Sequence, residues 1–225
     1  MIDLKIKEFI AQNSSTLRFG SGYHGEQHWE NVERNGYYLA QFNNADKMVI
    51  SYFAFIHDSM REDDGKDLGH GPRAASFIMK HREEFPLDDE QFKQLKDACK
   101  GHTVGERPDC ITINTCWDAD RLDLARVGIV PSSKYLFNEE AKRIADQGDY
   151  GVLEKYKIEG STLIEKIVIQ ALSIFISGAI MYIFLNDRPW PDHIFLDLLV
   201  LLLALPAWYL IYRFFYKGSL SIIMN

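Results

Sequence analysis

The residue types that could do chemistry in this chain are histidine and aspartate. The chain has seven histidines, and one of them, His57, is followed directly by Asp58 at the end of an apolar run. A buried helix that ends in two adjacent polar residues needs a partner for them, because unpaired buried polar groups are costly. His28 lies in an earlier segment, and Asp118 and Asp120 lie in a later one. Such donors from three helices can converge on one divalent cation, and the set suits Mn²⁺, Fe²⁺, Co²⁺, Zn²⁺ or Mg²⁺.

Short motifs around these residues follow one another along residues 20–130. They are H-x-x-x-H-W-x-x-V at 24–32, the apolar run into His57-Asp58, H-G-x-x-A-A at 70–75, G-H-T at 101–103 and D-A-D-R-L-D at 118–123. This ordered set resembles the HD-domain superfamily of metal-dependent phosphohydrolases. A single His-Asp pair would carry no weight, whereas the whole series is specific. The resemblance implies an all-α fold with a metal at the centre of the helices.

The resemblance also implies a set of metal ligands. Carried over residue by residue, the ligands are His28, His57, Asp58 and Asp120. Asp118 lies two residues before Asp120 on the same expected helix and is the alternative ligand.

A second metal is an open alternative, because some members of the superfamily bind two. His70 and His102 occupy places comparable to the two additional histidines of those members. These residues are equally suited to donating hydrogen bonds to phosphate. The cofactor is therefore expected to be one or two divalent metal ions.

Other side chains near the motifs could act on a phosphate group. Arg61 follows Asp58 by about one helical turn, so it can face the same cavity, and Arg73 lies within the His70 motif. Both are candidates for substrate binding, because the guanidinium group suits phosphate. The resemblance implies that Asp58 is both a ligand and a catalytic residue next to the attacking water. Glu26 is the remaining nearby carboxylate that could act as a base.

Several neighbouring polar residues favour structural roles instead. We expect His24 and His81 to be solvated surface residues. Arg121 and Asp123 flank Asp120, and we expect them to form a structural ion pair.

The segments that must position these residues are expected to be helices. Apolar spacing at helical periodicity predicts them, and strand signals are few. The fold class is therefore expected to be all-α. Together with the resemblance, this implies an HD-type helical bundle, which we expect to be followed by two transmembrane helices. The expected helices of the bundle and its linker cover residues 2–12, 24–42, 45–61, 71–85, 89–99, 111–125, 138–147 and 154–165.

Composition excludes several other classes of protein. The 225 residues are 47% hydrophobic and 25% charged, which is typical of a globular protein and unlike a disordered or collagen-like chain. The net charge of −7, without a basic stripe, argues against binding to a nucleic-acid duplex. Three cysteines without a C-x-x-C pair argue against a disulfide scaffold and fit a reducing compartment.

The last part of the chain is far more apolar than the rest. Residues 167–185 carry no charge, and residues 194–216 carry only Asp197 and Arg213. At the rise of an α-helix, each segment is about 28–35 Å long and matches a bilayer core of about 30 Å. The polar turn between them contains Pro189 and Pro191. We therefore expect a transmembrane hairpin over 167–216, a juxtamembrane linker helix over 151–166 and an HD-type domain over 1–150.

Charge and the N-terminus predict orientation. Three positively charged residues precede the first span: Lys155, Lys157 and Lys166. Arg188 is the one lysine or arginine in the loop between the spans. The positive-inside rule then places both termini and the HD domain in the cytoplasm of a multi-pass inner-membrane protein. The N-terminal residues lack the apolar region of a signal peptide. Small residues at 177–179 suggest homo-oligomer formation through the spans.

The expected function is that of a membrane-anchored phosphohydrolase that cleaves a nucleotide or related small phosphoester through a metal-activated water. Its partners are then the phosphorylated substrate and membrane lipid. One alternative is a nucleotide-sensing regulatory module coupled to the hairpin. Another is an HD-type di-iron oxygenase, which would need two irons. Metal content and oxygen consumption distinguish the oxygenase, and turnover of nucleotides distinguishes the sensor.

Overall fold

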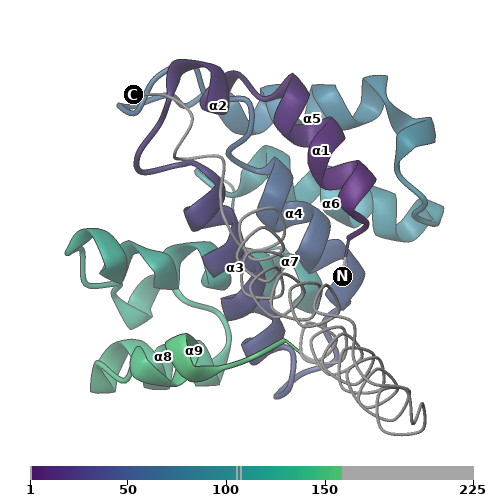
Figure 1. The fold of residues 1–225 in the computed structure, drawn as a ribbon. Helices are drawn as coiled ribbons and strands as arrows, with labels where there is room; N and C mark the ends of the chain where they lie inside the picture. The colour runs from purple at the N-terminus through teal and green to yellow at the C-terminus, as the bar shows by residue number, and fades with distance from the viewer. Residues whose placement is uncertain (1, 105, 107, 159–225) are drawn as a thin grey trace, which may run out of the picture. The chain divides into compact units, whose positions relative to one another are not determined.

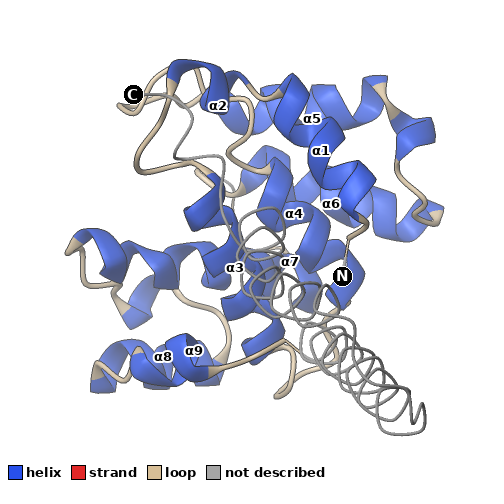
Figure 2. Cartoon of the chain, in the orientation of Figure 1, coloured by secondary structure: helices blue, strands red, loops and turns tan. Residues whose placement is uncertain are grey.

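The computed structural model describes residues 2–104, 106 and 108–158, and every regular element within them is helical (Figure 2). The all-α prediction is thereby confirmed for this part of the chain. The elements are α1 (Leu4–Asn13), α2 (Ser15–Phe19), α3 (Glu26–Leu39), α4 (Lys47–Ile56), α5 (His70–Lys80), α6 (Asp89–Gly101), α7 (Ile111–Leu122), α8 (Glu139–Gln147) and α9 (Gly151–Lys155), with 3-10 turns η1 (Arg82–Glu84), η2 (Asp123–Val127) and η3 (Ser133–Tyr135).

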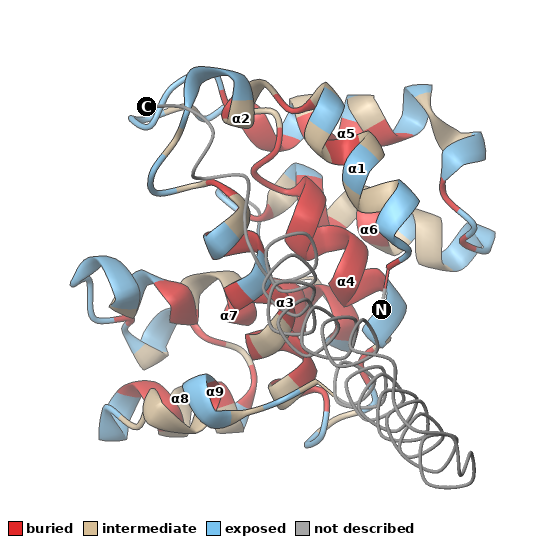
Figure 3. Cartoon of the chain, viewed as in Figure 1, coloured by how far each residue is buried: buried red, intermediate tan, exposed pale blue. Residues whose placement is uncertain are grey.

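Helix α4 is the core of this domain. Its residues from Val49 to Ile56 are all buried, and it contacts α3, α6 and α7 (Figures 1 and 3). A helix that is apolar on every side has to be surrounded by other elements. Asp46 caps its first turn by accepting hydrogen bonds from the backbone N–H groups of Met48 and Val49. The apolar run of the sequence therefore carries His57 and Asp58 into the centre of the domain.

Glycine allows two pairs of helices to approach closely. A Cβ atom at Gly36 would lie 2.4 Å from a methyl carbon of Ile50, so α3 packs directly on α4. A Cβ atom at Gly71 would lie 2.6 Å from the carbonyl oxygen of Cys99, where α5 packs on α6. Contacts this short exclude any larger side chain without movement of the helices.

The end of α4 differs from the prediction of a helix over 45–61. The helix ends at Ile56, and its last carbonyl groups accept hydrogen bonds from both backbone and side-chain groups of the turn that follows. His57 Nδ1 lies 3.0 Å from the carbonyl oxygen of Phe53, and Ser59 Oγ donates to that of Ile56 at 2.8 Å. We expected Arg61 to follow Asp58 by about one turn of a continuous helix. It instead comes after the turn that ends α4.

The expected helix over 111–125 is also shorter than predicted. It divides into α7 and the 3-10 turn η2, so Asp123 lies at the start of a different element from Asp120. The short α2 was not predicted. It is a single capped turn, in which Ser14 Oγ accepts a hydrogen bond from the N–H group of Leu17. Five residues are too few to show a periodic pattern.

The linker helix expected over 154–165 ends early in the part that is described. Helix α9 stops at Lys155 and Tyr156 is extended. Tyr156 and Ile158 both pack against the core, which the two-residue period of an extended chain allows.

The expected transmembrane spans at 167–185 and 194–216 lie outside the described residues. Within 2–104, 106 and 108–158, no helix has the length and apolarity that crossing a bilayer requires.

Candidate metal centre

Histidine and aspartate side chains gather where the ends of α3 to α7 meet. The C-terminal end of α4 supplies two of them, and the other helices supply one each. They are His28 near the start of α3, His57 and Asp58 after α4, His70 at the start of α5, His102 after α6 and Asp120 near the end of α7. The structure thus brings together the residues that the resemblance implied as ligands and the two additional histidines.

The first group of ligand atoms comes from His28, His57 and Asp120. The Nε2 atoms of the two histidines are 3.1 Å apart. Asp120 Oδ1 lies 3.3 Å from His28 Nε2 and 3.5 Å from His57 Nε2. Three ligand atoms at such short mutual distances surround a single point, which one cation could occupy.

The second group comes from Asp58, His70 and His102. The Nε2 atoms of His70 and His102 are 2.7 Å apart, and Asp58 Oδ1 lies 3.0 Å and 3.5 Å from them respectively. The other carboxylate oxygen, Asp58 Oδ2, lies 3.6 Å from His28 Nε2. Asp58 therefore faces both groups, with one oxygen toward each.

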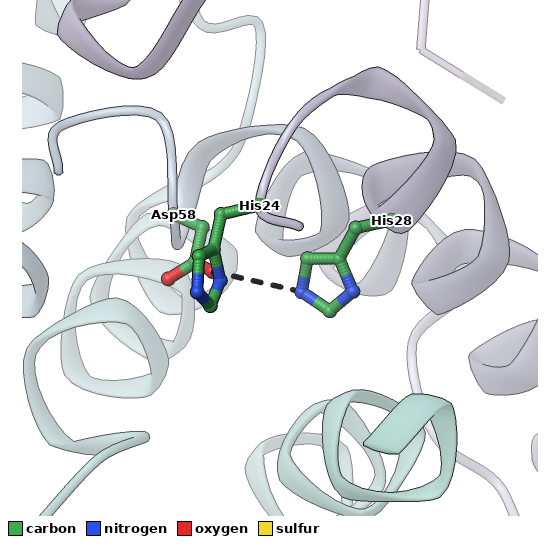
Figure 4. A group of neighbouring side chains, drawn as sticks. All are labelled: His24, His28 and Asp58. Atoms are coloured by element: carbon green, nitrogen blue, oxygen red, sulfur yellow. Dashed lines mark hydrogen bonds and ion pairs between the residues drawn. The ribbon is translucent and has the colours of Figure 1, made fainter. Parts of the chain in front are cut away.

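His24 is a member of the cluster that sequence analysis missed. It precedes α3, and its Nδ1 lies 2.7 Å from Asp58 Oδ2. Figure 4 shows its ring beside Asp58, with the His28 ring facing them. The expectation of a solvated surface histidine is therefore wrong. The H-x-x-x-H spacing could have indicated this role, because it places the imidazoles of His24 and His28 close together at the start of α3.

The second nitrogen of each ligand histidine is held by an acceptor outside the cluster. His28 Nδ1 lies 2.7 Å from Asp123 Oδ2, and His102 Nδ1 lies 2.8 Å from the Cys99 carbonyl oxygen. His57 and His70 use Nδ1 in the same way, toward the backbone carbonyl groups of Phe53 and Asp67. An imidazole that donates through Nδ1 presents its Nε2 lone pair on the other side, which fixes the tautomer that binds metal.

Asp123 is not the partner of Arg121 that the sequence led us to expect. Its Oδ2 accepts hydrogen bonds from His28 and from Arg126 Nε at 3.0 Å, and its Oδ1 accepts one from Asn31 at 2.9 Å. Arg121 instead donates to the carbonyl oxygen of Tyr135 at 2.8 Å. The break between α7 and η2 turns Asp123 toward α3, so it orients a ligand histidine.

Charges in the cluster shift its acid–base equilibria. Burial alone would raise the pKa of the Asp58 and Asp120 carboxyls, but the neighbouring imidazoles outweigh it and hold both pKa values well below their usual range. Burial alone would lower the pKa of His28, yet hydrogen bonds with Asp120 and Asp123 raise it to about 10. Burial lowers the pKa of His102. Both carboxylates are thus ionised, and metal binding at His28 would displace a proton.

The donor chemistry fits a divalent cation. If the histidines are neutral, their Nδ1 bonds leave lone pairs of His70 and His102 facing each other, and likewise those of His28 and His57. Facing lone pairs repel unless a proton or a cation lies between them. Mixed imidazole and carboxylate ligation is shared by several transition metals, so the set does not select one metal.

Apart from His57, the residues of the cluster line a cavity of about 520 Å³. Arg61 lines this cavity, and its guanidinium lies 3.5 Å from Asp58 Oδ1. It is held in place by donating to the backbone carbonyl groups of Asp63 at 3.2 Å and Gly65 at 2.7 Å. The cavity is lined by Tyr23, His24, His28, Asp58, Arg61, His70, His102, Thr103, Asp120, Asp123, Leu124, Arg126, Val127 and Ile129.

Two residues suggested by the sequence lie away from this lining. Arg73 donates to the carbonyl oxygen of Met60 at 2.9 Å and pairs with Asp67, so it braces the loop before α5. Glu26 lies in the first turn of α3, where burial raises the pKa of its carboxyl. Neither lines the cavity.

Asp118, the alternative ligand, faces the opposite side of α7. It accepts hydrogen bonds from the backbone N–H groups of Phe137 at 3.0 Å and Asn138 at 2.7 Å. Burial raises the pKa of its carboxyl. The structure thus places Asp118 in the anchor of the chain before α8 and Asp120 in the cluster.

Comparison with known proteins bears on the fold. No protein-family model matches the chain, and no curated protein matches it. Among solved structures, the chain is similar to the crystal structure of a predicted HD superfamily hydrolase from an uncultured Thermotogales bacterium, with a TM-score of 0.52 and 20% sequence identity. The match covers 74% of this chain and 92% of that one. At this identity the likeness concerns the fold alone.

Proposed function

We propose that this protein is a metal-dependent phosphohydrolase that cleaves a small phosphoester. The observation that carries the proposal is Asp58, which faces two groups of ligand atoms and lines the cavity. The likeness to a predicted HD superfamily hydrolase supports it at the level of the fold. We further propose that the phosphoester is a nucleotide or a related compound.

The cluster would hold one or two cations. His28, His57, Asp58 and Asp120 would hold the first, and Asp58, His70 and His102 the second. When bound, a divalent cation supplies a Lewis acid for a phosphoryl oxygen and lowers the pKa of water.

We propose that Arg61 binds the phosphoryl group. Its guanidinium is buried, lines the cavity and lies beside Asp58. Backbone carbonyl groups already fix its orientation, so little reorganisation is needed when negative charge develops on the phosphoryl oxygens. The remaining guanidinium N–H donors would bind those oxygens.

We propose that His24, which lines the cavity, acts as a general acid. Its Nδ1 contacts Asp58 Oδ2, and its side chain is 27% exposed. This contact orients the ring, and the other ring nitrogen, Nε2, would donate its proton to the leaving oxygen.

Membrane anchoring is part of this proposal and depends on residues 167–185 and 194–216. Their apolar sequences favour a hairpin in the inner membrane with the helical domain in the cytoplasm. Membrane lipid and a second copy of the chain are the proposed partners there.

The proposal is tested by measuring metal content and phosphate release together. Detergent-purified protein would be assayed on a panel of nucleotides with Mn²⁺, Mg²⁺ or Fe²⁺, beside an Asp58→Ala variant. Asp97→Ala is a matched control, because the Asp97 side chain is 37% exposed on α6 and pairs only with lysines among the described residues. We expect metal-dependent release in the wild type and the control, and loss of both metal and release in Asp58→Ala.

Other outcomes would redirect the assignment. Bound metal without release from any phosphoester would favour the sensor alternative. Oxygen uptake by the iron-loaded protein would favour the di-iron oxygenase alternative, which the second ligand group makes structurally feasible. Absence of bound metal would contradict the ligand set itself.

A further inference from the structure

The mouth of the metal-centre cavity is apolar. Tyr23, Leu124, Val127 and Ile129 line the cavity, and they are 60%, 38%, 37% and 54% exposed. Single exposed apolar side chains are ordinary on a protein surface. A group of them around one cavity marks a binding surface. We call these four residues the apolar rim.

The apolar rim is held in place by defined hydrogen bonds. Gly128, with φ of +80°, ends η2, and the backbone N–H group of Ile129 returns to the Leu124 carbonyl oxygen at 3.1 Å. Arg126 ties the two sides of the mouth together, because it donates to the Tyr23 carbonyl oxygen at 2.8 Å and to Asp123 at 3.0 Å. The rim is thus connected through Asp123 to the ligand His28.

The cavity has few groups that could read the polar edges of a ligand. Among its described lining residues there is no asparagine, glutamine, serine or lysine. Outside the metal centre, Arg61 and Tyr23, the polar lining side chains are Thr103, Asp123 and Arg126. Asp123 accepts hydrogen bonds from His28, Asn31 and Arg126. Thr103 contacts His70 and Arg126 holds the rim. Selection among nucleobases requires hydrogen bonds to their edges, and the described lining offers few side chains for them.

We propose that the apolar rim binds the leaving group of the substrate, and that the preferred substrates are phosphoesters whose alcohol is apolar or presents a flat apolar face. This inference rests on the proposed phosphohydrolase function and names its substrate class. The phosphate would lie at the metal centre beside Arg61, and the alcohol would extend across Val127 and Ile129. A cavity of about 520 Å³ accommodates more than a phosphate group, since ligand pockets of about 300–1,000 Å³ hold whole small molecules.

Binding is tested with methyl-, propyl- and hexylphosphonate, which cannot be hydrolysed. Calorimetry on the detergent-purified, Mn²⁺-loaded full chain gives each Kd, with titration into detergent alone as the blank. Each fully buried methylene is worth about fourfold in affinity. If at least two of the five added methylenes are buried, the Kd should fall at least about tenfold from methyl to hexyl. The same series of alkyl phosphates should show a parallel rise in kcat/KM.

Variants identify the surface that produces this dependence. Ile129→Ser should flatten the dependence on chain length and leave metal content and methylphosphonate binding unchanged. Val130→Ser is the matched control, because Val130 is 75% exposed on the same turn and does not line the cavity. AMP and GMP differ only at the edges of the base, and we expect their kcat/KM values to agree within about tenfold.

The possible failures are separable. Phosphate release without any dependence on chain length, or a strong preference between AMP and GMP, would overturn the inference and leave the proposed function standing. A Kd that falls with chain length while no ester is hydrolysed would support the rim and overturn the proposed function. Absence of both binding and hydrolysis would overturn both.

Discussion

At the scale of single residues, the metal centre depends on acceptors that are not themselves ligands. His28 can present Nε2 to a cation because Asp123 holds its Nδ1 proton. Asp123 is in turn held by Asn31 and Arg126. A carboxylate behind a ligand histidine increases the basicity of the histidine and fixes its ring. The site is therefore larger than its ligand set.

Replacing Asp123 tests this outer contact. We expect Asp123→Asn to weaken metal binding by about 10–100-fold, because the amide retains the shape but loses the charge that supports His28. Metal affinity would be measured by competition with a chelator. Asp97→Asn on the surface of α6 is the control and should bind metal like the wild type. An unchanged affinity in Asp123→Asn would mean that Asp123 only supports the fold.

At the scale of elements, the ends of the helices build the site and their spacing sets its geometry. His70 begins α5 and His102 follows α6, and these two helices meet at Gly71. A Cβ atom at position 71 would also lie 3.3 Å from the His102 ring. The distance between the two histidines is therefore tied to the absence of a side chain at one position.

Gly71→Ala should push α5 away from α6. We expect a loss of about 1–3 kcal/mol in the free energy of unfolding, together with a lower metal content. Urea unfolding and metal analysis would measure the two effects. Gly151→Ala on α9 is the control, because a Cβ atom there meets no atom within 4 Å. Normal metal content in Gly71→Ala would show that the second ligand group tolerates the displacement.

Helix α8 is attached to α3 by a carboxylate whose charge state depends on pH. Arg143 donates to Glu140 at 2.7 Å and Tyr38 donates to it at 2.9 Å. The hydrogen bond from Arg143 is the main reason that the pKa of Glu140 lies below its ordinary value of 4.5. A lowered pKa means that this contribution to stability is complete above that ordinary value and is lost as the pH falls through the folded-state pKa.

Glu140→Gln should therefore reduce the free energy of unfolding at neutral pH and leave it unchanged in acid. We expect it to lower the free energy of unfolding by about 0.5–1 kcal/mol at neutral pH. The difference from the wild type should disappear once Glu140 is protonated, because a neutral carboxyl and an amide then interact alike. Urea unfolding across a pH series measures this. Glu139→Gln serves as the control, since Glu139 is exposed and contacts only Lys142 among the described residues. A difference that persists in acid would contradict the charge-based explanation.

At the scale of the whole molecule, metal binding should be linked to folding. The ligands come from the ends of helices α3 to α7, so a cation stabilises the packed arrangement and not the unfolded chain. Removing the metal with a chelator should lower Tm by about 5–10 °C if the metal is present at about 100 times its Kd. Asp58→Ala should show no change in Tm on chelation. A wild-type Tm that is insensitive to the chelator would indicate that the cluster is stable without metal.

Membrane association is a further property of the whole chain. Because residues 167–185 and 194–216 are apolar over the thickness of a bilayer, we expect the protein to stay with membranes after washing with alkaline carbonate. Leu202→Arg should weaken insertion, since a central arginine costs about 2.5–3.5 kcal/mol, whereas Leu202→Ile should not. Release of the wild-type protein by carbonate would refute the hairpin.

Most of the helices and the identity of the cluster could be predicted from the amino-acid sequence. The run of apolar residues in α4 predicts a buried helix, because apolar side chains are removed from water. His57 and Asp58 follow the end of this helix, so they are expected to lie inside the domain. The order of histidines and aspartates along the chain carries the resemblance to the HD-domain superfamily, and that resemblance implied the ligand set. These features are local, so they can be read without knowing what packs against them.

Which atoms meet could be learned only from the folded domain. Tertiary packing turned Asp123 toward His28, placed His24 on Asp58, and assigned Asp118 to the chain before α8. It also placed an apolar rim beside the cluster from two segments distant in sequence. Such pairings depend on where helices end and how closely they pack, and a side chain moved by one residue faces another partner. No local pattern contains that information, because distances between sequence-distant residues are set by the packing of the whole domain.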